Sequence, residues 1–423
     1  MSNVKQVDEL LQGLELAQPV ISRRDDAYNG IGRLRYTADE VKGDLKNFAV
    51  NINRLAINAV AERMRIKRLT AMVSYKDDKS EALEQLARYS RLEHLLQCAL
   101  IESMTTGVAY LVTWVDSSGY PRIWVEDGKH MWARLDESGD VVDAVKRWYD
   151  KEPNGVVTGE NVVHYTADKI VTYRRGGNSV LEVVDSVDNP FGVVPVFPLI
   201  NSDRPGDDIG YSVLDDLAPI TAALSKVLAD MLVTSESVAR PRRWASGIPL
   251  EEDEGDGFTA DSPESVDAAK TPVKAPFADG EDMFVTESTE AKFGQLAGAD
   301  LGGYERAVNV LVAQIEAISG LPGHQLGVQT ANPTSADAIR ASESSLTARA
   351  DSRIRILGVA VEDCLRMLLA MWVEADFTDV DVTVRWASTA TRSHAQEADA
   401  ATKLYSLGII DRDEARDMLG LVQ

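Results

Sequence analysis

The sequence predicts an α+β protein, and three patterns lead to that prediction. Apolar residues recur at helical spacing from residue 44 to 104, and again from residue 219 onward. Between residues 107 and 200 the apolar period changes to two, with Gly, Asn and Asp turn signals between short runs. The chain has 423 residues, more than one hydrophobic core normally organises, so we expect two or three domains.

The part near the N-terminus should contain two amphipathic helices that pack in one domain. The first is expected from Asp44 to Leu69 and the second from Ser80 to Met104, because apolar residues in both recur every three or four positions. The first helix should end in a basic run that comprises Arg63, Arg65, Lys67 and Arg68.

The middle part should be mostly β. VAYLVTWV and YPRIWVE surround a Ser-Ser-Gly turn and predict a hairpin, and short strands follow to about residue 185. This part closes with NPFGVVPVFPLIN, in which Pro195 and Pro198 restrict the segment to the edge of a sheet, since proline cannot donate to a central ladder.

A long helix is expected from about Pro219 to Val238, with Pro219 in its first turn. From residue 240 to about 278 the chain is rich in acidic residues, Gly and Pro, which predicts a small extended subdomain.

The most regular helix of the sequence follows, because its apolar residues alternate steps of three and four. Such a heptad seam is narrower than a usual globular helix face, so it favours lengthwise packing on one or two neighbouring helices, in the same chain or in another copy. Gly320 should end this helix. The seam comprises Leu301, Tyr304, Val308, Leu311, Ile315 and Ile318.

A third long helix should begin at a capping box of Thr334 and Asp337 and run to about Val373, with a kink at Gly358. The segment DVDVTVRW predicts one strand. Two short helices, 394–407 and 411–419, should then surround a turn at Gly408.

The charge of the chain excludes nucleic-acid binding by bulk attraction. The formal net charge is −23 and the pI is about 4.7, whereas duplex binding needs Lys and Arg to neutralise phosphates. Solubility is the simplest explanation of this imbalance. Residues 251–290 carry 13 acidic side chains against Lys270 and Lys274, so nearly half of the excess charge lies in one segment.

The N-terminus has acidic residues where a secretory signal would be basic and then apolar, so we expect an intracellular protein. No stretch approaches the roughly 20 unbroken apolar residues of a bilayer span, so no transmembrane helix is expected. Cys98 and Cys364 are predicted to be small buried hydrophobes.

The chain shows few signs of chemistry. The phosphate-binding loop, the Gly-x-Ser-x-Gly elbow and the His-Glu-x-x-His pair are all missing, and the five histidines lack metal-ligand spacing. Adjacent acids such as Asp215 and Asp216 are common in so acidic a chain. We therefore expect no catalytic residues, metal site or cofactor, and a protein that is not an enzyme.

Six stretches in this order resemble the portal proteins of tailed bacteriophages, in particular the branch with siphophage-type heads. They are YNGIGRLRY, VNINRLAINAVAERMRIKRL, TGVAYLVTW, NPFGVVPVFPLIN, DMLVTSESVARPRRWASGIP and SGLPGHQLGVQTANPTSADAIRASESSL. The resemblance covers almost the whole chain. It implies the portal fold, with a mixed α/β wing, a two-helix stem, a small clip, a long kinked helix and an α-helical crown. The implied divisions are 1–210 (wing), 211–239 (stem helix), 240–290 (clip), 291–319 (second stem helix), 320–333 (tunnel loop), 334–375 (long wing helix) and 376–423 (strand and short crown).

The resemblance also implies a function. Portal proteins form a ring, usually of twelve copies, at one vertex of the capsid, through which DNA enters during packaging and leaves on ejection. The implied partners are other copies of the chain, the terminase large subunit, the head-to-tail adaptor, and the major capsid and scaffolding proteins. Double-stranded DNA would pass without sequence-specific binding, and no membrane is involved. The implied location is the virion, after assembly in the host cytoplasm.

Two candidate sites follow from the resemblance. The tunnel loop would face DNA, and its glycines permit backbone shapes closed to other residues, while its amide and imidazole groups offer weak polar contacts. The clip would contact terminase and then the adaptor. Its arginines are expected to pair with acids of a neighbouring subunit rather than to bind DNA, and Trp244 to be a packing anchor. The tunnel loop residues are Gly320, Leu321, Gly323, His324, Gln325, Gly327, Gln329 and Asn332, and the clip residues are Arg240, Arg242, Arg243, Trp244, Glu251, Glu252, Asp253 and Glu254.

Four arginines of the third long helix, Arg340, Arg349, Arg353 and Arg355, are expected to form ion pairs between subunits. Two other functions remain open from the residues alone. One is a scaffold or interaction protein that assembles through the heptad seam without a channel, and the other is a diverged enzyme. The segment 320–333 would then be a surface connector without a role of its own.

Overall fold

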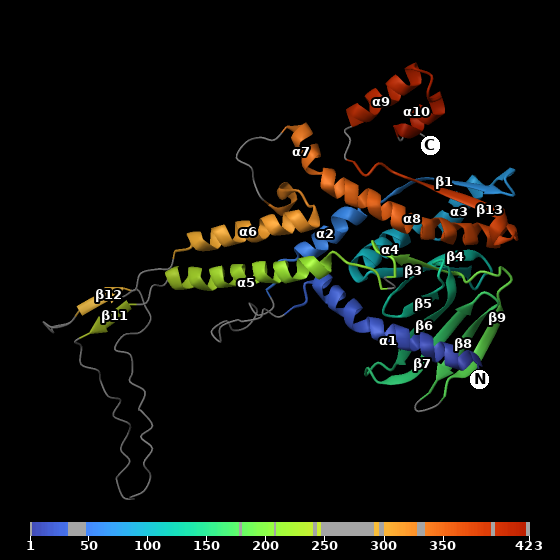
Figure 1. Ribbon diagram of the computed structural model, residues 1–423, viewed down its shortest axis with the longest axis horizontal. Helices are drawn as coiled ribbons and strands as arrows, with labels where there is room; N and C mark the ends of the chain where they lie inside the picture. Colours follow the sequence, from blue (N-terminus) through green and yellow to red (C-terminus); the bar gives the residue numbers. More distant parts are fainter. Residues whose placement is uncertain are drawn as a thin grey trace, which may run out of the picture. The chain divides into compact units, whose positions relative to one another are not determined.

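The computed structural model describes residues 2–32, 48–176, 180–206, 209–239, 243–246, 292–295, 300–327, 335–390 and 394–419. The chain forms two compact units. The first contains residues 1–226 and 308–423, and the second contains residues 227–307. Helices and antiparallel sheets both contribute to the first unit, which confirms the mixed α and β content that the sequence predicts (Figure 1).

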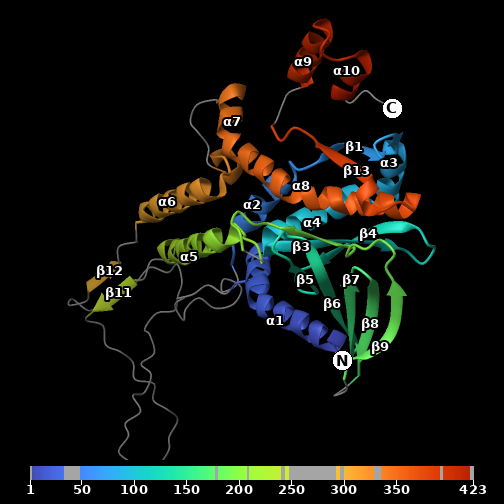
Figure 2. The same cartoon turned by 45° about the vertical axis from the view of Figure 1, so that its right-hand side comes forward.

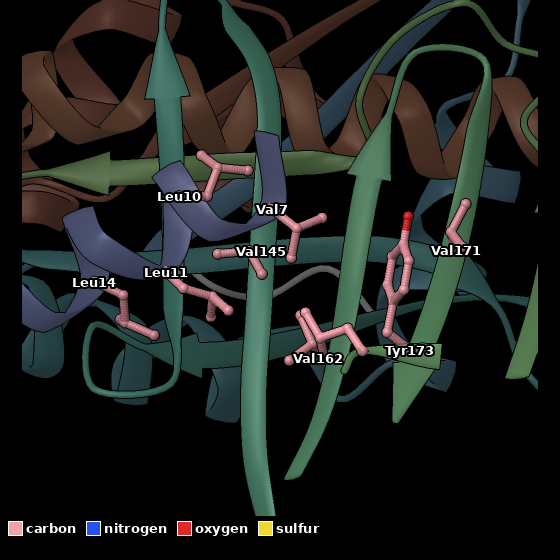
Figure 3. Close-up of a cluster of buried hydrophobic side chains, with 9 residues drawn as sticks. Val7, Leu10, Leu11, Leu14, Val145, Val162, Val171 and Tyr173 are labelled. Carbon is pink, nitrogen blue, oxygen red and sulfur yellow. The ribbon is translucent and has the colours of Figure 1, made fainter. Parts of the chain in front are cut away.

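The N-terminal helix α1 (Ser2–Asn29) packs on a five-stranded antiparallel sheet, and the sequence analysis missed it. Its apolar residues Val7, Leu10, Leu11 and Leu14 are buried. Figure 3 shows them facing Val145, Val162 and Tyr173 of the sheet. The sheet has the strand order β5 (Met131–Leu135), β6 (Val141–Lys151), β7 (Val157–Thr166), β8 (Lys169–Arg175) and β9 (Glu182–Asp188).

A three-stranded sheet contains the predicted hairpin. β3 (Val108–Val115) pairs with β4 (Pro121–Asp127) on one side and with β10 (Val196–Ile200) on the other. Because β10 is an edge strand, Pro198 lies opposite Tyr110 without interrupting a central ladder, as the sequence predicts.

The first two predicted helices are wrong in their extent. The helix expected over 44–69 is α2 (Ile52–Ala61) within the described residues, and the basic run after it enters the strand β1 (Ile66–Val73). β1 pairs with β13 (Val380–Trp386) and with the short β2 (Asp77–Asp78). The helix expected over 80–104 is divided into α3 (Ser80–Tyr89) and α4 (Leu92–Thr106), because Arg91 takes a left-handed backbone with φ of 56°.

The third long helix is divided as well. α7 (Ala336–Ser342) begins at the cap Ser335, whose side chain accepts from the amide of Ala338, so the cap is one residue after the predicted Thr334. α8 (Ser344–Val373) then runs without a break through Gly358, and the interruption lies at Glu343 instead. α8 lies between the sheet that contains β13 and the sheet that contains β3 (Figures 1 and 2).

Of the remaining elements, α6 and the two C-terminal helices agree closely with the predicted bounds, whereas α5 begins at Leu214, so Pro219 lies inside this helix and not in its first turn as predicted. The turn at Gly408 has φ of 68° and separates two short helices, as expected. These elements are α5 (Leu214–Ala239), β11 (Arg243–Ser246), β12 (Lys292–Gln295), α6 (Gly302–Ser319), the 3-10 turns η2 (Gly323–Leu326) and η3 (Phe377–Asp379), α9 (His394–Ser406) and α10 (Arg412–Met418).

Two expectations about apolar residues need correction. Cys364 is buried, as predicted, but Cys98 is exposed on α4. In the described part of the chain, the segment Leu214–Ser235 of α5 is long and apolar enough to cross a bilayer, although the sequence analysis expected no such segment; 28% of its apolar window is buried. Core helices of proteins outside membranes can be equally long and apolar, so one such helix is weak evidence for a membrane span.

Candidate functional site

The start of the predicted tunnel loop is anchored to the first unit. α6 ends at Ser319, and Gly320 turns the chain with φ of 69°. A Cβ atom on Gly320 would lie 2.6 Å from Nε of Arg349 and 2.7 Å from Oγ of Ser345, so only glycine fits. Leu321 is 1% exposed. The prediction that Leu321 faces DNA is therefore wrong, because its apolar side chain is buried in its own chain.

The next residues form a tight polar turn. The amide of Gly323 donates to Oε1 of Glu316 at 3.0 Å, and η2 continues to Leu326. Gly327 ends this turn with φ of 79°. His324 is exposed and Gln325 is half-buried. Of the other predicted loop residues, Gln329 and Asn332 lie outside the described residues.

A half-buried ion pair ties this turn to distant parts of the chain. Glu343, at the break between α7 and α8, accepts from Nη2 of Arg63 at 3.1 Å, and Nε2 of His324 lies 3.8 Å from its other oxygen. Arg63 also donates to the backbone carbonyl of Thr389 at 2.8 Å, and the Thr389 hydroxyl reaches Asp351 at 2.6 Å. Sequence reasoning missed this network, because no pattern links Arg63 to a residue 280 positions later.

The first turn of α5 is held by charged and polar contacts. Asp215 accepts hydrogen bonds from Arg24 and Arg23 of α1. Burial would raise the pKa of the Asp215 carboxyl, but these two guanidinium groups hold the pKa below its usual value. Further along, the hydroxyl of Thr221 donates to Asn53 at 3.1 Å. Asp215 therefore takes part in the contacts that hold the start of α5 on α1.

Helix α8 is joined to the segment before α5. Arg353 donates to Oδ1 of Asn201 at 2.6 Å and to both oxygens of Asp203 at 2.6 and 2.7 Å. Arg353 therefore has its partners within its own chain, and the expectation of a pair between subunits is wrong for this residue.

The second unit holds the described part of the predicted clip. β11 pairs with β12, with Trp244 opposite Gly294 and Arg243 opposite Gln295. Within the same unit the hydroxyl groups of Thr234 on α5 and Tyr304 on α6 are 2.9 Å apart. The predicted clip residues Arg240, Arg242, Glu251, Glu252, Asp253 and Glu254 lie outside the described residues.

The heptad seam is partly covered in the single chain. Ile315 is fully buried, and the other five seam residues are half-buried. Val310, which is not in the seam, is 62% exposed on α6, and Leu232 is 45% exposed on α5. The two helices therefore retain apolar surface that their own chain does not cover.

The described residues do not form a recognisable catalytic or metal site. The arrangement nearest to one is His164, Asp143 and Arg134, in which Asp143 accepts two hydrogen bonds from Arg134 and lies 3.2 Å from Nε2 of His164. Both His164 and Asp143 are buried, so a substrate cannot reach them. Among the described residues, no group of three or more His, Cys, Asp or Glu side chains could hold a metal ion.

Comparison with known proteins gives matches along nearly the whole chain. Residues 10–423 match the family described as phage portal protein, SPP1 Gp6-like. The portal protein of Mycobacterium phage L5 is 26% identical over 98% of this chain and 85% of its own length. The portal protein of Mycobacterium phage D29 is 27% identical over 88% of this chain and 76% of its own length.

Two solved structures of gene transfer agent (GTA) particles are also similar. A chain from the neck of an empty GTA particle is 15% identical, with a TM-score of 0.47 over 87% of this chain and 88% of that chain. A chain from the neck of a native GTA particle, computed with C12 symmetry, is 16% identical, with a TM-score of 0.43 over the same shares. The family match, over residues 10–423, confirms the resemblance seen in the sequence: the chain belongs to the SPP1 Gp6-like family of phage portal proteins.

Proposed function

We propose that copies of this chain close into a ring at one vertex of a phage head, and that double-stranded DNA passes along the axis of the ring during packaging and ejection. Twelve copies are the number we expect. Membership of the portal family supports the role, and the incomplete burial of the apolar helix α5 is the structural observation that carries it.

The apolar helix α5 requires a cover that the single chain does not supply. Only 28% of the apolar window in Leu214–Ser235 is buried. Most of the other side chains in this window are half-buried, and Leu232 is 45% exposed. Because exposed apolar surface is unfavourable in water, a second surface over this helix would stabilise it. We infer that the equivalent helices of a neighbouring copy supply this surface, and the exposed side chains Leu232 and Val310 are the first candidates for the contact.

The charges of the two helices suit a channel for a polyanion. α5 carries four acidic residues and Lys226, and α6 carries two acidic residues and Arg306. A wall with few cations releases no counterions from DNA and so does not bind it tightly. DNA could then slide along the channel without being held.

The divisions of the chain follow the same proposal. Residues 211–239 and 291–319 form the stem, 240–290 the clip that contacts terminase and then the adaptor, and 376–423 the crown. The wing, 1–210 with 334–375, contacts capsid and scaffolding proteins. Within the tunnel loop, 320–333, we restrict the surface that faces DNA to His324 and the residues after it, because Gly320 and Leu321 are buried.

A charge substitution in the loop tests the proposal. The double variant Gln329→Lys, Asn332→Lys should assemble but package DNA several-fold more slowly, since each added cation can bind a phosphate. The matched double variant with alanine at both positions should package normally. DNase-protected DNA in heads that contain each variant measures the effect. If the lysine variant packages DNA at the wild-type rate, the proposal that this loop faces the DNA is wrong.

A further inference from the structure

A groove of about 580 Å³ lies between the start of β1 and the junction of α3 and α4, far in sequence from the proposed stem and loop. Its floor is apolar, because Leu69, Ala87 and Leu92 line it and are buried. A cavity of this size with an apolar floor is typical of sites that bind a ligand or a short segment of another protein.

The walls of the groove are basic, although the chain as a whole is strongly acidic. Lys67 and Arg68 come from β1, and Arg88 and Arg91 come from the end of α3 and the turn after it. The acidic side chains in the lining are Glu84, which is 3.6 Å from Arg88, and Glu93. The lining of the groove thus has four cations and two acidic side chains, whereas the whole chain has a net charge of −23.

The pairing of β1 with β13 increases the positive charge at this place. Arg68 lies directly opposite Arg385, and both are exposed. A bulge at this point gives β1 the extra residue Lys67. Like charges on directly opposite strand residues are destabilising, and the carboxylate that interacts with Arg68 is that of Asp78, whose pKa is lowered by hydrogen bonds from Ser80 and then by Arg68. A local arrangement of like charges that lowers the stability of the fold is typical of a binding surface.

The backbone of Arg91 is a second, independent departure from what stability favours. Its φ of 56° is in the left-handed region, which glycine or asparagine adopts more readily than arginine. This backbone joins α3 to α4 and places the Arg91 cation in the lining of the groove.

The edge of β1 in the groove is open to another strand. β2 pairs only with Met72 and Val73, so the described residues place no strand beside the first half of β1 on that side. A strand edge without a neighbouring strand is the usual place where an extended peptide adds to a sheet.

We propose that this groove binds an extended, acidic and partly apolar segment of a partner protein, which pairs with the edge of β1. Acidic side chains of the segment would meet Arg68, Arg88 and Arg91, and alternate apolar side chains would cover the floor. A DNA duplex would meet the cations at the rim and leave the apolar floor uncovered, so a peptide fits better. The site does not depend on ring assembly, because all its residues lie in the first unit of one chain.

Selection of peptides by the full-length protein tests the proposal. A displayed library of random peptides about 12 residues long is the probe, a length that covers the open edge of β1. We expect the enriched peptides to be acidic with alternating apolar residues. Their binding, measured by fluorescence anisotropy, should weaken about tenfold or more in Arg68→Glu, Arg91→Glu, and should fall with added salt. Arg204→Glu, an exposed cation outside the groove, should bind like the wild type.

A second variant separates binding from folding. Arg91→Asn relieves the backbone, so its melting temperature should stay equal or rise while peptide binding weakens. Hydrogen exchange at the amides of residues 66–69 should slow when peptide is bound. Enriched peptides without acidic bias, or unchanged affinity in the double variant, would overturn the proposal. Tighter binding of a short DNA duplex than of any selected peptide would also overturn it and assign the groove to nucleic acid.

Discussion

Arg24 of α1 donates from Nη2 to Oδ2 of Asp215 at 2.6 Å and from Nε to Oδ1 at 3.3 Å, so its guanidinium reaches both oxygens of the first-turn carboxylate of α5. The third nitrogen of Arg24 donates to the carbonyl of Thr106 at 2.6 Å, where α4 ends. One side chain therefore joins three helices. In the proposed ring this pair fixes the start of the stem helix to the wing.

Removing Arg24 should destabilise the chain strongly. Arg24→Ala leaves the half-buried Asp215 and a buried carbonyl without their main donor, and we expect a loss of about 2 to 3 kcal/mol in the free energy of unfolding. Arg23→Ala is the control, because Arg23 contacts the same carboxylate at 3.0 Å but is 70% exposed. Arg23→Ala should lower the free energy of unfolding by less than about 1 kcal/mol. Urea denaturation of both variants measures the difference, and equal losses would refute the role of Arg24.

Two glycines should respond to alanine in opposite directions. At Gly320 a Cβ would meet Arg349 and Ser345 at under 3 Å with φ positive, so Gly320→Ala should cost about 1 to 2 kcal/mol. At Gly358 a Cβ would stand 3.4 Å from Nε1 of Trp386, in an uninterrupted helix, so Gly358→Ala should stabilise by up to about 1 kcal/mol. Melting temperatures of the two variants test this, and a loss at Gly358 would show that the added Cβ atom does not fit beside Trp386.

The stability of the fold should fall as pH rises from about 4.5 to 7. Burial, followed by the charge of Asp127, raises the pKa of Glu102 to about 7. Between the unfolded and folded pKa values, the unfolded state loses its proton while the folded state keeps it, so unfolding becomes more favourable across this window by up to about 3 kcal/mol.

Glu102→Gln should remove this dependence. The variant should match the wild type near pH 4 and exceed it in unfolding free energy at pH 8, whereas the exposed Glu93→Gln on the same helix should leave the pH profile unchanged. Denaturation curves at several pH values check this. A wild-type profile that is level between pH 5 and 7 would show that Glu102 is ionised in the fold.

Substitution of the uncovered apolar side chains should prevent assembly without unfolding the chain. Leu232→Lys, Val310→Lys places charges where we expect neighbouring copies to meet, and each change should cost about 1 to 2 kcal/mol at every interface of the ring. Val180→Lys is the control, since Val180 is 74% exposed just before β9 and far in sequence from α5 and α6. Light scattering should show small species for the double variant and the wild-type mass for the control.

Elements with a strong local period could be predicted from the sequence. The seam of α6 and its end at Gly320, the hairpin of β3 and β4, and the edge position of Pro198 all follow from local patterns. α1 was missed because Gly13 and Pro19 suggest breaks, while the helix is held by burial of Val7 and Leu14 on a distant sheet.

Long-range pairings could not be predicted in the same way. Arg68 and its neighbours were interpreted as the end of a helix, because their strand partner is β13, where Arg385, opposite Arg68, lies 317 positions later. The site was found only in part for the same reason. Gly320 and His324 lie in a recognisable loop, but the ion pair of Arg63 and Glu343 that anchors it depends on the fold. Resemblance to the portal family, rather than any motif of chemistry, pointed to the function.

Mass measurement and imaging of the purified protein test the central claim most directly, namely that many copies close around an open axis. Twelve chains of 46.2 kDa should give a particle of about 550 kDa, and electron microscopy should show rings with a central hole wide enough for a duplex. A monomer or dimer at every concentration, or a particle that is solid at its centre, would contradict the account.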